Sequence, residues 1–309
     1  MGNSTWSGDA WKNISSNNQS QSTNQIFTQN VKKTVANDMN PKGIAFRESR
    51  DSVEHPETLA IAIFLDETGS MGQIPEDIVK NRLGSLMETL IKHGLPDGQV
   101  MFCGIGDEKC DEYPLQVSQF ESGTNELNKW LGSLYLEGNG GGNGGESYLL
   151  SWYFAARHTS IDCFEKRDQK GLLFTIGDEP NHQTLSGSKI SALMGLSEPM
   201  ADMTADELLS EVQKTYNVFH IHLNHSNYGN NDTVAEGWKK KLGERVIVLS
   251  DYTEIAELIA STCAIIHGAD LDAVIADFDS KTARNIKTAL TIVNQTLQKS
   301  NTKAGVITL

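Results

Sequence analysis

The sequence predicts an α/β fold: a doubly wound, mainly parallel sheet of six strands, with helices on both faces and one short antiparallel edge strand. Two observations carry this prediction. From residue 59 onward, short apolar runs alternate with amphipathic segments, an order that is typical of parallel sheets whose strands are joined by helices. The first run, 59–65, is also apolar at every position, as in a strand that is covered on both faces.

Local patterns define the individual elements. The helix after the first strand carries apolar residues at helical spacing from Ile78 to Ile91, and Gly94 offers its stop. The segment 114–120 begins with a proline, which an edge strand tolerates at its first residue. The other expected strands are 100–105, 171–176, 218–223 and 246–249, and the other expected helices are 126–134, 146–158, 205–214, 233–242 and 253–266.

Three regions are expected along the chain: a polar arm at 1–45, the α/β domain at 46–268, and a helical extension at 269–309 that packs on the domain. Asn, Ser, Gln and Thr dominate the beginning of the arm. Because this composition buries little apolar surface, we expect the arm to be mobile. Its tryptophans, Trp6 and Trp11, leave open the alternative that it docks on a neighbouring subunit.

The chain has a formal net charge of −14, from 26 basic and 40 acidic residues. This charge disfavours nucleic acid and anionic membranes as partners, because both would repel the protein. No apolar stretch is long enough to span a membrane, and the N-terminus lacks the pattern of a secretory signal. The four widely spaced cysteines are expected to be free thiols. We therefore expect a cytoplasmic protein.

Polar segments follow three of the expected strands: 66–70, 107–108 and 178–179. Ligands of doubly wound sheets bind at the carboxyl ends of the strands, near the point where the strand order reverses, so these segments are expected to meet. A glycine-rich loop, 138–146, could fold over the same edge. Carboxylates and hydroxyls suit Mg²⁺, Mn²⁺ or Ca²⁺ better than zinc or copper. The alternative for any one acid is a helix cap or a solvated loop.

The pattern Asp66-x-Thr68-x-Ser70, between an apolar strand and an amphipathic helix, resembles the metal-ion-dependent adhesion site of von Willebrand factor A (VWA) domains. The usual pattern is Asp-x-Ser-x-Ser, and Thr68 keeps the hydroxyl oxygen. The family's later aspartate, after the fourth strand, matches Asp178. The resemblance covers 59–266. It implies that Thr68 and Ser70 bind the ion directly, and that Asp66 and Asp178 bind it directly or through water.

The glycine-rich loop departs from the common family pattern, which has a metal-binding threonine there. It is similar to a variant loop of integrin β subunits in which a glutamate reaches the metal, and by that match Glu146 is a ligand. Asn143 would then support the ligands or hold an accessory ion, and Ser147 is the alternative ligand. Glu146 is expected to begin a helix, where an anion is favoured. Three further side chains are expected in or near the cleft: Asp107, Glu179 and His222.

Two other motifs are weak indications of a dinucleotide site and a zinc site. The loop matches G-x-G-x-x-G at 140–145, but the dinucleotide fingerprint follows the first strand of a βαβ unit, whereas this loop follows an amphipathic helix. His220 and His222 share one strand face at a spacing that zinc sites use. In a sheet that is covered on both faces, a role as core histidines is favoured.

These features predict a metal-dependent protein-binding module rather than an enzyme, with Mg²⁺ (or Mn²⁺ or Ca²⁺) binding an Asp or Glu of a protein partner. The connection 181–203 would flank the cleft and influence the choice of partner. The family resemblance adds adaptors of AAA-type ATPases and subunits of larger machines as partner classes. Two alternatives remain open. One is a structural subunit that uses the arm and the C-terminal helices, and the other is a metal-dependent hydrolase, for which a convincing base or nucleophile is missing.

Overall fold

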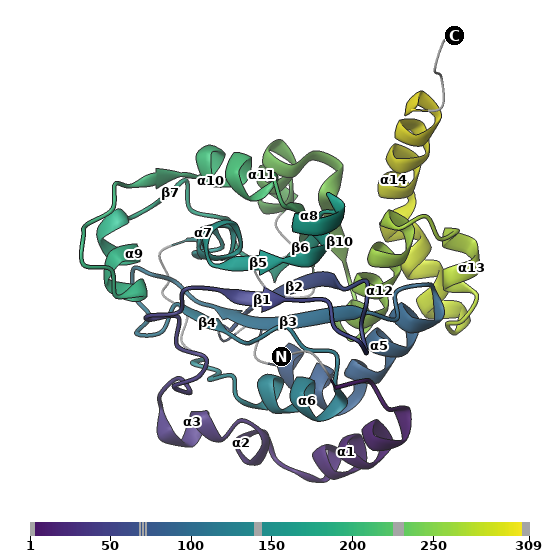
Figure 1. Ribbon diagram of the computed structural model, residues 1–309, viewed down its shortest axis with the longest axis horizontal. Helices are drawn as coiled ribbons and strands as arrows, with labels where there is room; N and C mark the ends of the chain where they lie inside the picture. The colour runs from purple at the N-terminus through teal and green to yellow at the C-terminus, as the bar shows by residue number, and fades with distance from the viewer. Residues whose placement is uncertain are drawn as a thin grey trace.

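The computed structural model describes residues 4–67, 69, 71, 73–138, 144–224 and 232–304, with side chains up to residue 297. It has a mixed α/β fold around a six-stranded sheet (Figure 1). The strands of this sheet are β2 Leu59–Asp66, β3 Gly98–Ile105, β4 Leu115–Val117, β6 Gly171–Gly177, β9 Tyr216–Leu223 and β10 Val246–Leu249. They lie in the order β10-β9-β6-β2-β3-β4, and every neighbouring pair is parallel except β3 with β4. The expected mainly parallel sheet with an antiparallel edge strand is confirmed.

Helices cover both faces of the sheet (Figure 1). On one face lie α7 Leu149–Arg157, α10 Ala205–Val212 and α11 Asp232–Leu242, and on the other lie α5 Leu83–Lys92, α6 Thr124–Gly132 and α12 Ile255–Ile266. Every residue of β2 and β3 is therefore buried. This double coverage explains why the central strands are apolar at successive positions rather than at alternate ones.

The strand order reverses between β2 and β6. From β2 the chain passes to β3 and β4 on one side, and it later places β6, β9 and β10 on the other. Leu65 pairs with Ile176, so Asp66 and Asp178 leave the sheet at neighbouring positions. Sheets with such a reversal bind their ligands at this edge.

The N-terminal region differs from the expected mobile arm, because it folds onto the domain. It forms α1 Gly8–Ser20, α2 Thr23–Ile26 and α3 Thr28–Lys32. Ser7 caps α1 by accepting a hydrogen bond from the backbone of Ala10 at 3.3 Å. Trp11 is buried against Gly84, where an added Cβ would lie 2.2 Å from the indole nitrogen. The tryptophan that suggested docking on another subunit thus docks on its own chain.

Polar side chains of α1 bond to a π-helical turn, η1 Ile78–Arg82, which precedes α5. Asn18 Nδ2 donates to the carbonyl of Val79 at 3.0 Å, and Ser15 Oγ donates to the carbonyl of Lys80 at 2.6 Å. Both carbonyls lie where the regular α-helical pairing is interrupted. The composition of the arm did not reveal this packing, because its polar side chains serve as partners for the backbone.

Several short elements complete the fold. A two-stranded parallel sheet joins β1 Arg47–Ser49 to β5 Thr159–Ile161, and an antiparallel pair joins β7 Thr184–Leu185 to β8 Met203–Thr204. The connection 181–203 therefore holds structure of its own, including α9 Gly187–Met194. The remaining elements are α4 Gln73–Asp77, α8 Asp162–Arg167, η2 Gly243–Arg245, η3 Tyr252–Glu254, α13 Leu271–Ile275 and α14 Ser280–Ala304.

The C-terminal helices pack on the domain, as expected. Ile286, Leu290 and Val293 of α14 are buried, while the last turns of α14 extend away from the sheet (Figure 1). The four cysteines are free thiols, and three of them are buried. Within the described ranges, no helix combines the length and the apolar character needed to cross a membrane.

Candidate functional site

The hydroxyl of Tyr148 bonds to one carboxylate that the sequence predicts for the site, and the charges of two others act on it. Tyr148 Oη donates to Asp66 Oδ2 at 2.7 Å. Burial first, and then the charges of Asp66, Glu146 and Asp178, raise the pKa of Tyr148 well above its ordinary value, so the hydroxyl remains a donor. All four side chains are buried. Parallel-strand register and the position of Tyr148 thus bring together residues that are far apart in the sequence.

Tyr148 is a site residue that the sequence reasoning missed. It stands just before α7, and its ring packs edge-on against His220 and Trp238 at centroid distances of 5.5 and 5.3 Å. Gly177, the last residue of β6, leaves room for the hydroxyl, because a Cβ there would lie 1.8 Å from Tyr148 Oη. The one sequence signal for this packing is a glycine directly before Asp178.

The expectation that Glu146 begins a helix is wrong. Helix α7 starts at Leu149, and Glu146 instead forms a parallel bridge with Asn181. Its N–H donates to the carbonyl of Pro180 at 3.0 Å, and its carbonyl accepts from the N–H of His182 at 3.3 Å. Backbone pairing with the segment after β6, and not a helix N-terminus, therefore positions this carboxylate.

Glu146 is buried among other acids. Burial, and then the charges of Asp66, Asp107, Asp111 and Glu179, raise the pKa of Glu146 to about 10. Its Oε2 atom is buried and has no hydrogen-bond partner among the described residues. A carboxylate in such surroundings is destabilised when it ionises, and a bound cation would reverse that cost.

The segment after β2 lies against the start of the glycine-rich loop. An added Cβ at Gly69 would lie 2.9 Å from the carbonyl oxygen of Gly138, and the N–H of Gly138 is 3.4 Å from the carbonyl of Glu67. Only a glycine at position 69 permits this approach without a shift. Three expected site residues of these two segments fall outside the described ranges: Thr68, Ser70 and Asn143.

Glu67 is a second residue that sequence reasoning missed. Its side chain is buried over Gly104 of β3, where an added Cβ would lie 2.1 Å from the carboxyl carbon, and Gln116 of β4 donates to its Oε2. Burial, and then the charges of Asp66 and Glu137, raise the pKa of Glu67 well above its ordinary value. The glycine inside β3 is the feature that makes room for it.

Asp107 follows β3, and its side chain is hydrogen-bonded to the segment before α7. Its Oδ1 accepts from Ser147 Oγ at 3.1 Å and lies 3.0 Å from His182 Nε2. Ser147 Oγ in turn accepts from the N–H of Glu108 at 2.9 Å. Because its hydroxyl is engaged by these bonds, Ser147 is better suited to orienting Asp107 than to binding a metal directly. His182 is a further residue that sequence reasoning missed.

The remaining expected residues lie on the β6–β9 side. The carbonyl of Glu179 accepts from Trp238 Nε1 at 3.1 Å, and burial followed by the charge of Asp178 raises the pKa of the Glu179 carboxyl. His222 is buried on β9, paired in register with Gly177. Its side chain therefore lies next to the end of β6.

His220 is a core residue, as the sequence favoured. Its ring stacks on Trp238 with centroids 3.6 Å apart, and its Nδ1 lies 2.9 Å from Thr175 Oγ1. Burial, and then His222, lower the pKa of His220 well below its ordinary value, so the ring is neutral. In the part of the chain that the structure describes, no three His, Cys, Asp or Glu side chains are grouped closely enough to hold a metal ion by themselves.

Comparisons with known proteins give structural similarities only. No protein-family model and no curated protein matches the chain. Among solved structures, the chain is similar to the pilus adhesin SpaC from Lactobacillus rhamnosus GG, with a TM-score of 0.45 and 8% identity, covering 68% of this chain and 30% of the adhesin. It is also similar to proximal thread matrix protein 1 from the mussel byssus, with a TM-score of 0.42 and 8% identity, covering 65% and 46% of the two chains. The matched region thus spans less than half of either protein.

Proposed function

We propose that the edge formed by β2 and β6 binds a divalent cation, Mg²⁺ or else Mn²⁺ or Ca²⁺, and that the protein is a VWA-type, metal-dependent protein-binding module. One observation carries the proposal. The hydroxyl of Tyr148 donates to Asp66 and is influenced by the charges of Glu146 and Asp178, and Glu146 Oε2 is buried without a hydrogen-bond partner in the described ranges. The reversal of strand order at this edge and the Asp66-x-Thr68-x-Ser70 pattern support it.

The available donors fit a hard cation. All are oxygen atoms, from carboxylates and from the hydroxyls that Thr68 and Ser70 would add, and this chemistry suits Mg²⁺, Mn²⁺ and Ca²⁺. Tyr148 orients Asp66, and the backbone bridge to Asn181 orients Glu146. When bound, the ion would offer an open position to a carboxylate of a protein partner.

Glu146 would also tune the strength of that contact. Where many VWA domains have a neutral threonine, this chain has a carboxylate, which would add a negative charge beside the ion. The added charge would tighten cation binding and weaken the attraction of the ion for a partner's carboxylate. We therefore expect reversible binding to the partner.

Capture of partners from an extract of the source cells tests this function. Immobilised protein in Mg²⁺ should retain a partner that EDTA releases, and Asp178→Ala should fail to retain it. Tyr153→Phe is the matched control, because the Tyr153 hydroxyl contacts Met200 at 3.4 Å and lies outside the carboxylate cluster. Retention of the same proteins in Mg²⁺ and in EDTA would contradict a metal-dependent function.

A further inference from the structure

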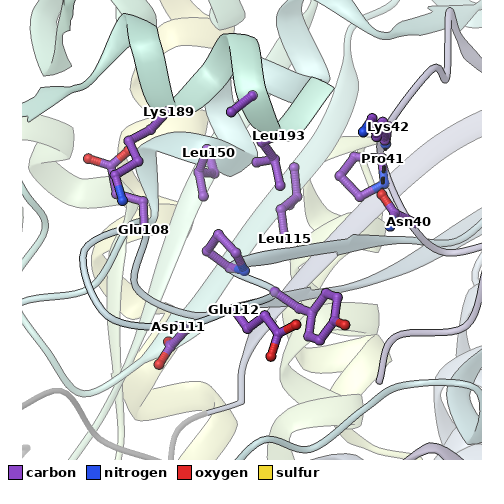
Figure 2. A pocket seen from close by; sticks show the side chains of 13 residues that line it. Asn40, Pro41, Lys42, Glu108, Asp111, Glu112, Leu115, Leu150, Lys189 and Leu193 are labelled. Carbon is purple, nitrogen blue, oxygen red and sulfur yellow. Dashed lines mark hydrogen bonds between the residues drawn. The ribbon is translucent and has the colours of Figure 1, made fainter. Parts of the chain in front are cut away.

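A separate pocket of about 290 Å³ opens between the segment 40–42, the loop after β3, and helices α7 and α9 (Figure 2). Its apolar wall includes Leu115 and Leu150, which are buried, and Leu193 of α9. This volume is at the lower end of the range for ligand pockets, so it suits a group of the size of an amino-acid side chain rather than a large cofactor.

One carboxylate on the pocket wall is buried and incompletely bonded. Glu108 is 6% exposed. Its Oε2 atom is buried and has no hydrogen-bond partner among the residues that the structure describes. Its backbone is fixed, because the N–H of Glu108 donates to Ser147 Oγ at 2.9 Å. A buried carboxylate oxygen without a donor is costly, so this wall favours a ligand that supplies one.

The charged side chains around the pocket indicate whether the ligand is a cation or an anion. Asp111 and Glu112 lie on the wall beside Glu108, whereas Lys42 and Lys189 are exposed. Among the residues that the structure describes, neither lysine forms an ion pair with Glu108. Water and salt screen the exposed lysines more strongly than they screen the buried carboxylate. The interior of the pocket is therefore suited to a cation.

We propose that this pocket, the Glu108 pocket, binds a guanidinium or ammonium group on an aliphatic stem, as carried by an arginine or lysine side chain of a protein partner. The stem would pack on the leucines of the wall, and the cationic end would donate to the Glu108 carboxylate. The pocket uses none of the proposed metal ligands, so this proposal stands or falls independently of the metal site.

Binding of capped amino acids to EDTA-treated full-length protein tests the proposal. N-acetyl-arginine amide should bind, as measured by ligand-observed NMR or calorimetry. N-acetyl-citrulline amide, which has nearly the same shape without the charge, should bind at least about tenfold more weakly. Equal binding of the two compounds, or no binding of the arginine compound, would overturn the proposal.

Three substitutions test whether the arginine compound binds in the Glu108 pocket. Glu108→Gln should weaken binding of the arginine compound by at least about tenfold, whereas Glu112→Gln, at an exposed acid of the same wall, should change it by less than about threefold. Lys189→Met removes an exposed cation and should tighten binding. Circular dichroism and thermal unfolding check that each variant folds. If Glu108→Gln does not fold, weaker binding in Lys189→Met would still refute a cation site.

Agmatine distinguishes a free small cation from a protein side chain. It carries the same guanidinium on an aliphatic stem that ends in an ammonium group, and it lacks the capped backbone. Binding of both agmatine and the arginine compound supports a side-chain ligand. Binding of agmatine together with rejection of the capped arginine would overturn the assignment to a protein partner.

Discussion

At the scale of single residues, Tyr148 connects the structure to the proposed chemistry. Its hydroxyl donates to Asp66, and its ring packs between Gly177 and the side chains of His220 and Trp238. A buried donor in a rigid setting fixes the orientation of the carboxylate that accepts from it. Residues in this position, which orient metal ligands without touching the metal, strongly affect metal affinity.

Tyr148→Phe should therefore weaken Mg²⁺ or Mn²⁺ binding by about 10- to 100-fold while the fold is retained. The loss arises because Asp66 keeps its charge but loses the donor that orients it. Calorimetric titration measures the change. Tyr153→Phe, in the helix that follows Tyr148, should leave the affinity unchanged, and an equal loss in both variants would contradict the role of Tyr148.

A second residue, Asp51, links stability to pH at the opposite end of the sheet. Burial alone would raise the pKa of Asp51, but hydrogen bonds from Arg167 and Thr58 outweigh it and hold this pKa below its ordinary value of 3.8. A carboxyl with a lowered folded-state pKa stabilises the fold above its unfolded-state pKa. This stabilisation is lost as the pH falls through the folded-state value.

Asp51→Asn should lower the free energy of unfolding at pH 7 by about 1–3 kcal/mol. The difference from the original protein should shrink as the pH is lowered below about 4, because Asp51 then binds a proton in the unfolded chain but not yet in the folded protein. Urea unfolding at pH 7 and at pH 3 measures both values. A difference of the same size at the two pH values would show that Asp51 acts through packing and not through its charge.

At the scale of elements, α1 supports the helical segment that follows the proposed metal loop. Asn18 and Ser15 donate to carbonyls of η1, and Trp11 fills the space above Gly84 at the start of α5. Because η1 follows directly after α4, which begins at residue 73, the N-terminal region stabilises the helix that leads out of the 66–70 segment.

Gly84→Ala should displace Trp11 and release α1. The added methyl group would overlap the indole, so we expect a destabilisation of about 1–3 kcal/mol and faster hydrogen exchange across 8–20. Gly237→Ala is the matched control, because Gly237 lies in α11 with no atom within 4 Å of an added Cβ. That substitution should be neutral or stabilising by up to about 1 kcal/mol. Unchanged exchange of α1 in Gly84→Ala would contradict the contact.

At the scale of the whole molecule, features that depend on local pattern were predictable from the sequence. The apolar run of β2 and the exact span of β10 follow from hydrophobic periodicity, and the meeting of Asp66 with Asp178 follows from parallel strand pairing. The bridge of Glu146 with Asn181 was not predictable, because it pairs backbones of two irregular segments. Likewise, no local pattern shows that Asn18 would serve as a donor to Val79.

The same arrangement of the sheet places two acidic sites near one another. The loop after β3 carries Asp107, which bonds to Ser147 beside Glu146, and Glu108, which faces the separate pocket. A partner that spans this edge would meet both sites. The formal net charge of −14 favours a partner with basic surface around its contact residues.

Calorimetric titration of Mn²⁺ into metal-free protein tests the central claim most directly. We predict saturable binding to the original protein, and affinities at least about tenfold lower for Ser70→Ala and for Asp178→Ala, since each change removes a proposed oxygen ligand. Tyr153→Phe should bind as the original protein does. Unchanged Mn²⁺ binding in both Ser70→Ala and Asp178→Ala, or no binding to the original protein, would contradict a metal site at this edge of the sheet.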